Sequence, residues 1–89
     1  LGRLARAMYY RDARVLTAET RRVIERALSI NALDVQTRML LGEDAFMHQR
    51  YDEAVSHWKM LLDAGVAPAQ QRALRNAIAN AESRARLQD

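Results

Sequence analysis

The sequence predicts an all-α domain in which antiparallel helical hairpins stack as a solenoid, closed by a C-terminal capping helix. Apolar residues recur at helical spacing along most of the 89 residues, which is the main signal of amphipathic helices. The break at Gln49-Arg50 is short, and short breaks join antiparallel neighbours. Gly42 and Ala54 are small residues at facing positions, so two helix axes can approach closely. The expected helices, with no strands, lie near 1–11, 17–30, 34–48, 51–64 and 69–87.

The central hairpin, residues 35–63, has the clearest pattern. The stripe of its first helix contains Arg38, Leu41, Gly42 and Ala45. The stripe of its second helix contains Tyr51, Ala54, Val55, Trp58, Leu61 and Leu62. Because large aromatic side chains at such positions are normally buried, we expect Trp58 in the core of the hairpin. We expect Gly42 to lie against the second helix near Ala54 or Val55.

The opening segment, residues 1–34, predicts an earlier hairpin of the same kind with three extra residues in its turn. With that extension, the core stripe of its first helix contains Leu1, Leu4, Ala5 and Met8. The core positions of its second helix are Thr20, Ile24, Ala27 and Leu28. Thr17 is a suitable N-cap for that second helix, and Asp34 for the next one, because each side-chain oxygen can accept from an unpaired N–H group.

The last segment, residues 69–88, predicts one long helix after the break at 65–68. Its apolar stripe is narrow and rich in alanine: Leu74, Ala77, Ile78, Ala81 and Ala85. The final hairpin of a stack leaves one apolar face uncovered, and a helix with a narrow stripe suits that face as a cap. The alternative, the first half of a further repeat, is less favoured because no second helix follows.

The central hairpin resembles the tetratricopeptide repeat (TPR), a helical hairpin of 34 residues. With Val35 at position 1 of the repeat, Leu41 and Gly42 fall on positions 7 and 8, and Trp58 falls on position 24. The departures from the pattern are Arg38, Ala45 and Leu61. The resemblance implies one TPR domain over residues 1–89, made of a repeat at 1–34, a repeat at 35–68 and a capping helix at 69–88.

More specifically, the chain resembles the periplasmic TPR domain of cytochrome c-type biogenesis proteins, which include the TPR subunit of haem lyase and its relative for formate-dependent nitrite reductase. The resemblance is carried by Tyr9-Tyr10, by the extended loop ending at 16–20 and by the run DAFM at 44–47. It implies a periplasmic, non-catalytic module that holds the C-terminal segment of an apocytochrome c, or of the nitrite reductase, during haem attachment. Other haem lyase subunits are further implied partners.

In the TPR pattern, the first helix of each hairpin lines the inner surface of the stack, so its inward positions are candidate binding residues. Aromatic and Met side chains there would offer large, adaptable contact area. Arg can fork onto a carboxylate, as Arg72 would for a C-terminal tail, and Asn can bond a peptide backbone. The candidates are Arg6, Tyr9, Tyr10, Met39, Glu43, Phe46, Met47, Arg72, Asn76 and Asn80. As alternatives, Tyr10, Phe46 and Met47 could be core residues, and the arginines could be solvated.

Nothing in the sequence indicates catalysis, a cofactor or a metal site. The absence of cysteine excludes disulfides and thiol chemistry, and there is no Gly-rich phosphate loop. His48 and His57 lie on different helices without a third ligand nearby, which does not suit a metal. The carboxylates expected to be helix-surface and capping charges are Glu43, Asp44, Asp52 and Glu53.

Charge and hydropathy also argue against nucleic-acid and membrane partners. The net charge is +3, but the arginines are scattered and segment 35–68 is net negative, so no continuous basic stripe forms. No stretch is long and apolar enough to cross a membrane. Leu1 opens directly into a helical pattern, so we expect a piece of a longer protein, with any membrane anchor in the segment upstream.

A second function stays open: a structural scaffold or self-association module without a dedicated peptide ligand. Such a module would present a large apolar patch on the outer face of the stack. Residues of the second helices would form that patch: Val23, Ile24, His57 and Met60.

Overall fold

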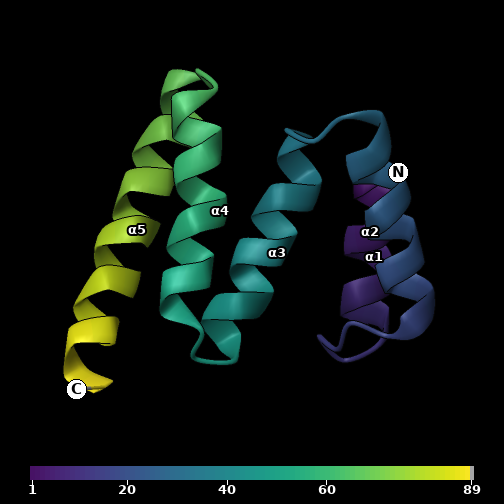
Figure 1. The fold of residues 1–89 in the computed structure, drawn as a ribbon, viewed down its shortest axis with the longest axis horizontal. Helices are drawn as coiled ribbons and strands as arrows, with labels where there is room; N and C mark the ends of the chain where they lie inside the picture. Colours follow the sequence, from purple (N-terminus) through teal and green to yellow (C-terminus); the bar gives the residue numbers. More distant parts are fainter. Residues whose placement is uncertain (89) are drawn as a thin grey trace.

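The structure, a computed structural model, describes residues 1–88, and over that range the regular elements are all helices. They are α1 (Gly2–Arg11), α2 (Ala18–Ile30), α3 (Val35–Met47), α4 (Tyr51–Asp63) and α5 (Pro68–Gln88). They form the antiparallel hairpins α1–α2 and α3–α4, and α5 packs against α4 (Figure 1). The predicted fold class is confirmed, and each helix end lies within one residue of its expected position.

Helix α3 is the wall shared by two hydrophobic cores. In Figure 1 the helices follow one another from α5 through α4 and α3 to the first hairpin, where α2 lies in front of α1. One core lies between α3, α4 and α5 and contains Trp58 and Leu61. The other lies between α1, α2 and α3 and contains Tyr9 and Leu40. Because α3 contributes to both cores, it fixes the first hairpin relative to the rest of the domain.

The predicted caps are present at the N-termini of α2 and α3. The Thr17 Oγ1 atom accepts from the backbone N–H of Thr20 at 3.2 Å. The Asp34 carboxylate accepts from the backbone N–H of Thr37 at 3.0 Å. Each cap satisfies a donor that has no partner within its helix, so both helices begin where the sequence predicts.

Two turns use left-handed backbone without glycine. In the extended turn between α1 and α2, Ala13 and Arg14 have φ angles of 57° and 62°. The backbone N–H of Arg14 donates to the Tyr9 carbonyl at 2.8 Å, which closes the end of α1. In the tight turn between α3 and α4, Gln49 has a φ angle of 64°. The hairpin geometry therefore holds these residues in a region that L-amino acids enter at a cost.

The buried face of α1 differs from the expectation. Leu1 and Leu4 were expected in the core stripe, but about half of each side chain is exposed. The buried residues are Gly2, Ala5, Met8 and Tyr9. A Cβ atom at Gly2 would collide with Asp34 in the connection between α2 and α3, so the close approach there turns α1 and directs its leucines outward.

Gly42 lies against α4 as predicted, but its neighbour is Trp58. The three atoms nearest to a Cβ at Gly42 all belong to the Trp58 indole, which lies one turn further along α4 than Ala54. The nearest neighbour thus lies about one turn beyond the expected Ala54 or Val55. The glycine makes room for the largest side chain of the hairpin, and only 7% of Trp58 is exposed.

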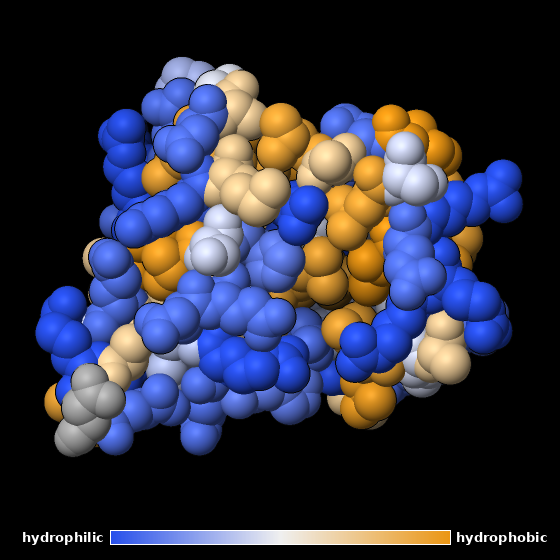
Figure 2. Space-filling model, viewed as in Figure 1, coloured by the Kyte–Doolittle hydropathy of each residue, from blue (hydrophilic) through white to orange (hydrophobic). Residues whose placement is uncertain are grey.

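The surface in Figure 2 has an uneven hydropathy. Apolar residues gather where α3 meets the first hairpin, whereas the outer side of α5 and the lower edge of the molecule are mainly hydrophilic. This distribution agrees with α5 as a cap, since its apolar side packs on α4 and its polar side faces water. Within residues 1–88, none of the helices combines the length and apolar character needed to cross a membrane.

Candidate functional site

Two adjoining depressions form a groove on the side of the domain lined by α1, α3 and α5. The larger one has a volume of about 250 Å³ and is lined by Arg6, Met39, Glu43, Trp58, Ala73, Leu74 and Ala77. The other has a volume of about 160 Å³ and is lined by Glu43, Phe46, Trp58, Ala77 and Asn80. The two share Glu43, Trp58 and Ala77, so they are continuous. We call them together the inner groove.

The sequence-predicted residues of α3 and part of those of α1 meet in this groove. Met39, Glu43 and Phe46 lie one turn apart along α3 and form its floor with the edge of Trp58. Arg6 contributes from α1, and the aromatic ring of Phe46 packs at 5.3 Å from that of Tyr51. The floor is therefore apolar except for the Glu43 carboxylate, which stands between the two depressions.

Tyr10 lies beside the groove together with Arg6, also on α1, and with Arg14 from the turn that follows α1; of the three, Arg6 lines the larger depression. The Tyr10 hydroxyl donates a hydrogen bond to Glu43 at 2.6 Å, and this bond is the main cause of a raised Tyr10 pKa. The guanidinium carbons of Arg6 and Arg14 lie 5.5 and 5.6 Å from the centre of the Tyr10 ring. Met47 is exposed beside them, with its sulfur 3.7 Å from Arg14 Nη1. We call Arg6, Tyr10 and Arg14 the α1 wall.

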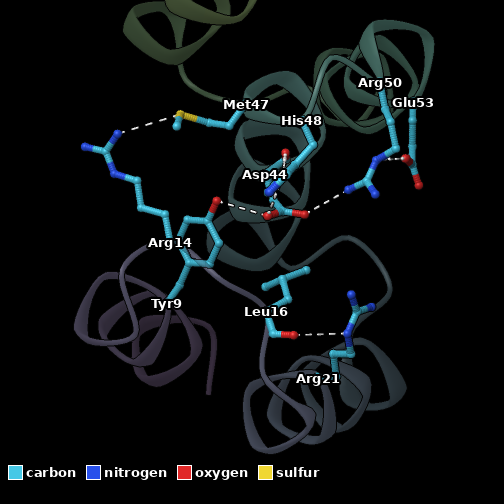
Figure 3. A network of polar contacts seen from close by, with 9 residues as sticks. All are labelled: Tyr9, Arg14, Leu16, Arg21, Asp44, Met47, His48, Arg50 and Glu53. Carbon is cyan, nitrogen blue, oxygen red and sulfur yellow. Dashed lines mark hydrogen bonds and ion pairs between the residues drawn. The ribbon is translucent and has the colours of Figure 1, made fainter.

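Tyr9, also predicted to contact a ligand, is fully buried and cannot do so. Its hydroxyl donates to Asp44 Oδ1 at 3.0 Å, while Arg50 Nη2 donates to Asp44 Oδ2 at 2.9 Å (Figure 3). His48 Nδ1 lies 3.2 Å from the same carboxylate. Burial, more than the hydrogen bond to Asp44, raises the pKa of Tyr9. Tyr9 therefore supports the groove from beneath and is corrected from a contact residue to a structural one.

Asp44 was expected to be a surface charge, and this expectation is wrong. Only 3% of Asp44 is exposed, and its carboxylate joins α1 to the turn that follows α3. Arg50 extends the network outward through an ion pair with Glu53 at 2.9 Å (Figure 3). The one signal available in the sequence was the resemblance itself, because Tyr9 and Asp44 both belong to the stretches that carry it.

On α5 the groove-facing register differs from the prediction. Asn80 lines the groove, but Arg72 and Asn76 are exposed and do not line either depression. Ala73 and Ala77 occupy the facing positions instead. One residue corresponds to a rotation of about 100° around a helix, so a small error in register moves a side chain off the groove.

Arg84, which contacts two residues of the groove, is a residue that the sequence did not point to. Its guanidinium lies over the Phe46 ring, with the guanidinium carbon 5.4 Å from the ring centre. Its Nε–H donates to Asn80 Oδ1 at 3.2 Å. The i, i+4 spacing of Asn80 and Arg84 allows this contact, but the packing of α5 decides that it faces the groove.

A larger hollow of about 440 Å³ lies at the N-terminal end of α4, and it shares no lining residue with the inner groove. It is lined mainly by charged and amide side chains of the α3–α4 turn and the end of α5, including Arg50, Glu53 and Gln88. Arg50 and Glu53 already pair with each other, and the Gln88 side chain donates to the Gln49 carbonyl at 3.3 Å. Three of the lining polar side chains are therefore already engaged within the domain.

No group of three or more potential metal ligands occurs within residues 1–88. His57 faces Arg38, with Nδ1 at 3.2 Å from Arg38 Nη1. Burial and then the Arg38 charge lower the His57 pKa. Of the residues expected in the outer patch of a scaffold module, Ile24 is buried and Met60 is exposed.

Comparisons with known proteins were made for the sequence and for the fold. A scan against protein-family models found no match. The chain is 37% identical over 60 residues to the formate-dependent nitrite reductase complex subunit NrfG of Escherichia coli, a match that covers 67% of the chain and 30% of NrfG. It is 36% identical over 86 residues to the cytochrome c-type biogenesis protein CycH of Pseudomonas aeruginosa, covering 97% of the chain and 20% of CycH.

The fold is similar to that of a crystal structure of the YfrE protein from Vibrio parahaemolyticus, with a TM-score of 0.83 at 24% sequence identity. That alignment covers 92% of the chain and 90% of the YfrE chain. The chain spans less than a third of the length of NrfG and of CycH, so the matches concern one domain of each. The resemblance predicted from the sequence is confirmed: the chain is a TPR-like domain homologous to the cytochrome c-type biogenesis protein CycH and to the nitrite reductase complex subunit NrfG.

Proposed function

We propose that this domain is a non-catalytic binding module for cytochrome c maturation, and that its inner groove holds the C-terminal segment of an apocytochrome c or of a c-type nitrite reductase. The observation that carries the proposal is the groove itself, which three helices form on the surface that a TPR stack uses for binding. The names of the two relatives, a biogenesis protein and a nitrite reductase complex subunit, favour this class of ligand.

The dimensions of the groove suit an amphipathic helix. The two depressions follow α3 from Met39 through Glu43 to Phe46, so their centres are separated by about one helical turn, or roughly 5–6 Å. Apolar side chains at positions i and i+4 of a ligand helix have the same separation. A ligand helix lying along α3 would place one such side chain in each depression, which is the helix-in-groove mode of recognition.

The proposed contact residues follow from their positions around the groove. Arg6, Met39, Glu43, Phe46 and Asn80 line it directly. Tyr10 and Met47 are exposed at its α1 side, and Arg72 and Asn76 lie on the exposed surface of α5, where a longer ligand would reach them. Other haem lyase subunits, as additional partners, and a periplasmic location belong to the same proposal.

A variant that fills the groove tests the proposal. Ala77 lines both depressions, so Ala77→Phe would occupy the space that the ligand needs. Ala79 lies on the exposed side of the same helix, and Ala79→Phe is the matched control. Isothermal titration would measure binding of C-terminal peptides from several c-type cytochromes to each variant.

We expect at least one peptide to bind the parent and the Ala79→Phe variant equally, and to lose binding to Ala77→Phe. Circular dichroism would verify that both variants keep their helices. Equal, weak binding of every peptide to the parent would contradict a dedicated apocytochrome role. Undiminished binding by Ala77→Phe would move the ligand to another surface.

A further inference from the structure

The α1 wall of the inner groove carries more positive than negative charge. Arg6 and Arg14 contribute two guanidinium groups, and Glu43 contributes the carboxylate at their side. Within residues 1–88 neither arginine forms an ion pair, and the side-chain partner of Glu43 is the neutral hydroxyl of Tyr10. Two guanidinium groups and one carboxylate therefore leave a local net charge of +1, which one further carboxylate would neutralise.

Both guanidinium groups are held in place before any ligand arrives. Each lies within 5.6 Å of the Tyr10 ring centre, a distance at which cation–π attraction operates. The ring is fixed by its hydrogen bond to Glu43 across the α1–α3 interface, and Arg14 also contacts the sulfur of Met47. An arginine that is already ordered loses less conformational entropy on binding, so such a wall favours specific recognition.

The α5 side of the groove does not offer the same chemistry. Its one guanidinium, that of Arg84, lies over Phe46 and already donates to the Asn80 side chain at 3.2 Å. Arg84, like Arg14, does not line either depression, whereas Arg6 lines the larger one, and of these guanidinium groups only that of Arg84 is already bonded to a side-chain oxygen within residues 1–88. A carboxylate placed in the centre of the groove would meet Glu43, which has the same charge. The α1 wall is thus the position where a ligand carboxylate is best accommodated.

We propose that the α1 wall binds a carboxylate of the ligand, held by the guanidinium groups of Arg6 and Arg14, so that the ligand is an amphipathic segment with one acidic edge. Its apolar side faces α3 and α5, and its carboxylate faces α1. The carboxylate is either the terminal one or that of an Asp or Glu side chain, because both present the same pair of oxygens to a guanidinium group. This inference rests on the proposed function, since it concerns the ligand of the same groove.

Peptide variants distinguish the two sources of the carboxylate. A bound cytochrome peptide would be compared with its C-terminal amide and with versions in which each acidic side chain is replaced by its amide. We expect one of these changes to weaken binding about tenfold, the effect of losing a charge-assisted hydrogen bond. The peptide whose binding is weakened then identifies the source of the carboxylate. The affinity of that peptide should also depend less on salt than the affinity of the parent peptide.

Protein variants place the carboxylate on the wall. Arg6→Gln and Arg14→Gln should each weaken binding of the parent peptide by a similar factor. They should have little further effect on binding of the peptide that lacks the carboxylate. Arg75→Gln, on the exposed surface of α5 outside the depressions, is the matched control and should bind as the parent does. Sensitivity at Arg84→Gln instead of the α1 wall would overturn the inference, as would equal binding of all peptide variants.

A small probe separates this inference from the proposed function. Hexanoate and hexylamine have the same chain and opposite charge, and NMR would follow the Nε–Hε signals of Arg6 and Arg14 during titration of each. We expect hexanoate to shift both signals and hexylamine to leave them in place. If hexanoate binds while no cytochrome peptide does, the carboxylate wall stands and the proposed ligand is wrong. If the two probes act alike, the wall does not select carboxylates.

Discussion

At the scale of single residues, the buried carboxylate of Asp44 is the feature that most needs compensating contacts. Burying a charge is costly unless hydrogen bonds and opposite charges compensate for it. Tyr9 and Arg50 supply that compensation from two different elements, at 3.0 and 2.9 Å. Two tyrosine–carboxylate pairs therefore join α1 to α3 side by side. The pair Tyr9–Asp44 is buried, and the adjacent pair Tyr10–Glu43 is exposed.

The Tyr9→Phe variant tests the contribution of the buried pair. It removes one hydrogen bond to Asp44 and leaves the ion pair with Arg50, so we expect a loss of about 1–2 kcal/mol in the free energy of unfolding. Urea denaturation followed by circular dichroism would measure it. Tyr10→Phe is the matched control, and there an exposed bond is lost at a cost below about 0.5 kcal/mol. Equal stability of the two variants would contradict the importance of burial.

The sequence could not identify which of two adjacent acids is buried. Glu43 and Asp44 are separated by about 100° on α3. The residues around them in the sequence do not mark either position as clearly polar or clearly apolar. Only the position of α1 against α3 decides that Asp44 meets Tyr9. Trp58 was predictable, by contrast, because a lone large aromatic at helical spacing within an apolar stripe has few other places to go.

At the scale of elements, the turn between α3 and α4 shows how a hairpin tolerates an unfavourable residue. The N–H groups of Gln49 and Arg50 donate back to the carbonyls of Phe46 and Ala45, at 3.1 and 2.8 Å. This is the arrangement in which a left-handed residue closes a helix, and glycine usually occupies that position. Gln49 occupies it here with a φ angle of 64°.

Gln49→Gly should therefore stabilise the domain. Relief of the left-handed conformation is worth roughly 1–2 kcal/mol, and the greater freedom of glycine in the unfolded chain offsets about half of it. We expect a net gain of about 0.5–1 kcal/mol in thermal or urea unfolding. Gln49→Ala removes the same side chain but keeps the Cβ atom, so it should give no gain. A stabilised alanine variant would show that the side chain, and not the backbone, is the cause.

Helix α5 explains why part of the candidate site escaped prediction. Alanine occupies positions around most of its circumference, so its apolar stripe has no sharp edge. Its buried side is set by Leu74, Ile78 and Ala81, and the groove-facing side follows from how these pack on α4. The line through Arg72 and Asn76 is polar in the sequence but lies off the groove. On α3 the predicted residues Met39, Glu43 and Phe46 line the groove, whereas Met47 does not.

At the scale of the whole molecule, the two cores are of unequal size. Within residues 1–88, the apolar cluster between α3, α4 and α5 contains eight buried residues and that between α1, α2 and α3 contains four, while Met8 and Ala27 are buried on α1 and α2 outside it. Periodicity in the sequence predicted both hairpins and the last helix, because each helix shows its own stripe. It could not predict the relative strength of the cores, since that depends on how many stripes meet at each interface.

Unequal cores predict unequal local stability. We expect the amides of α1 and α2 to exchange with solvent through a partial opening that leaves α3–α5 folded, because fewer buried contacts hold the first hairpin. Hydrogen exchange measured by NMR under native conditions would show smaller protection factors in α1 and α2 than in α4. Tyr9→Phe should widen the difference, because it weakens the joint between α1 and α3. Equal protection in α2 and α4 would indicate a single cooperative unit.

The contact between Gly42 and Trp58 gives the domain an optical reporter of its own. The chain contains one tryptophan, whose indole is almost wholly covered yet borders both depressions of the groove. Indole emission shifts with the polarity around the ring, so a side chain that displaces water from either depression should move the emission to shorter wavelength. Unfolding exposes the ring and moves it the other way. Ligand binding in the groove and unfolding of the domain can therefore be followed in one unlabelled sample, because they shift the tryptophan emission in opposite directions.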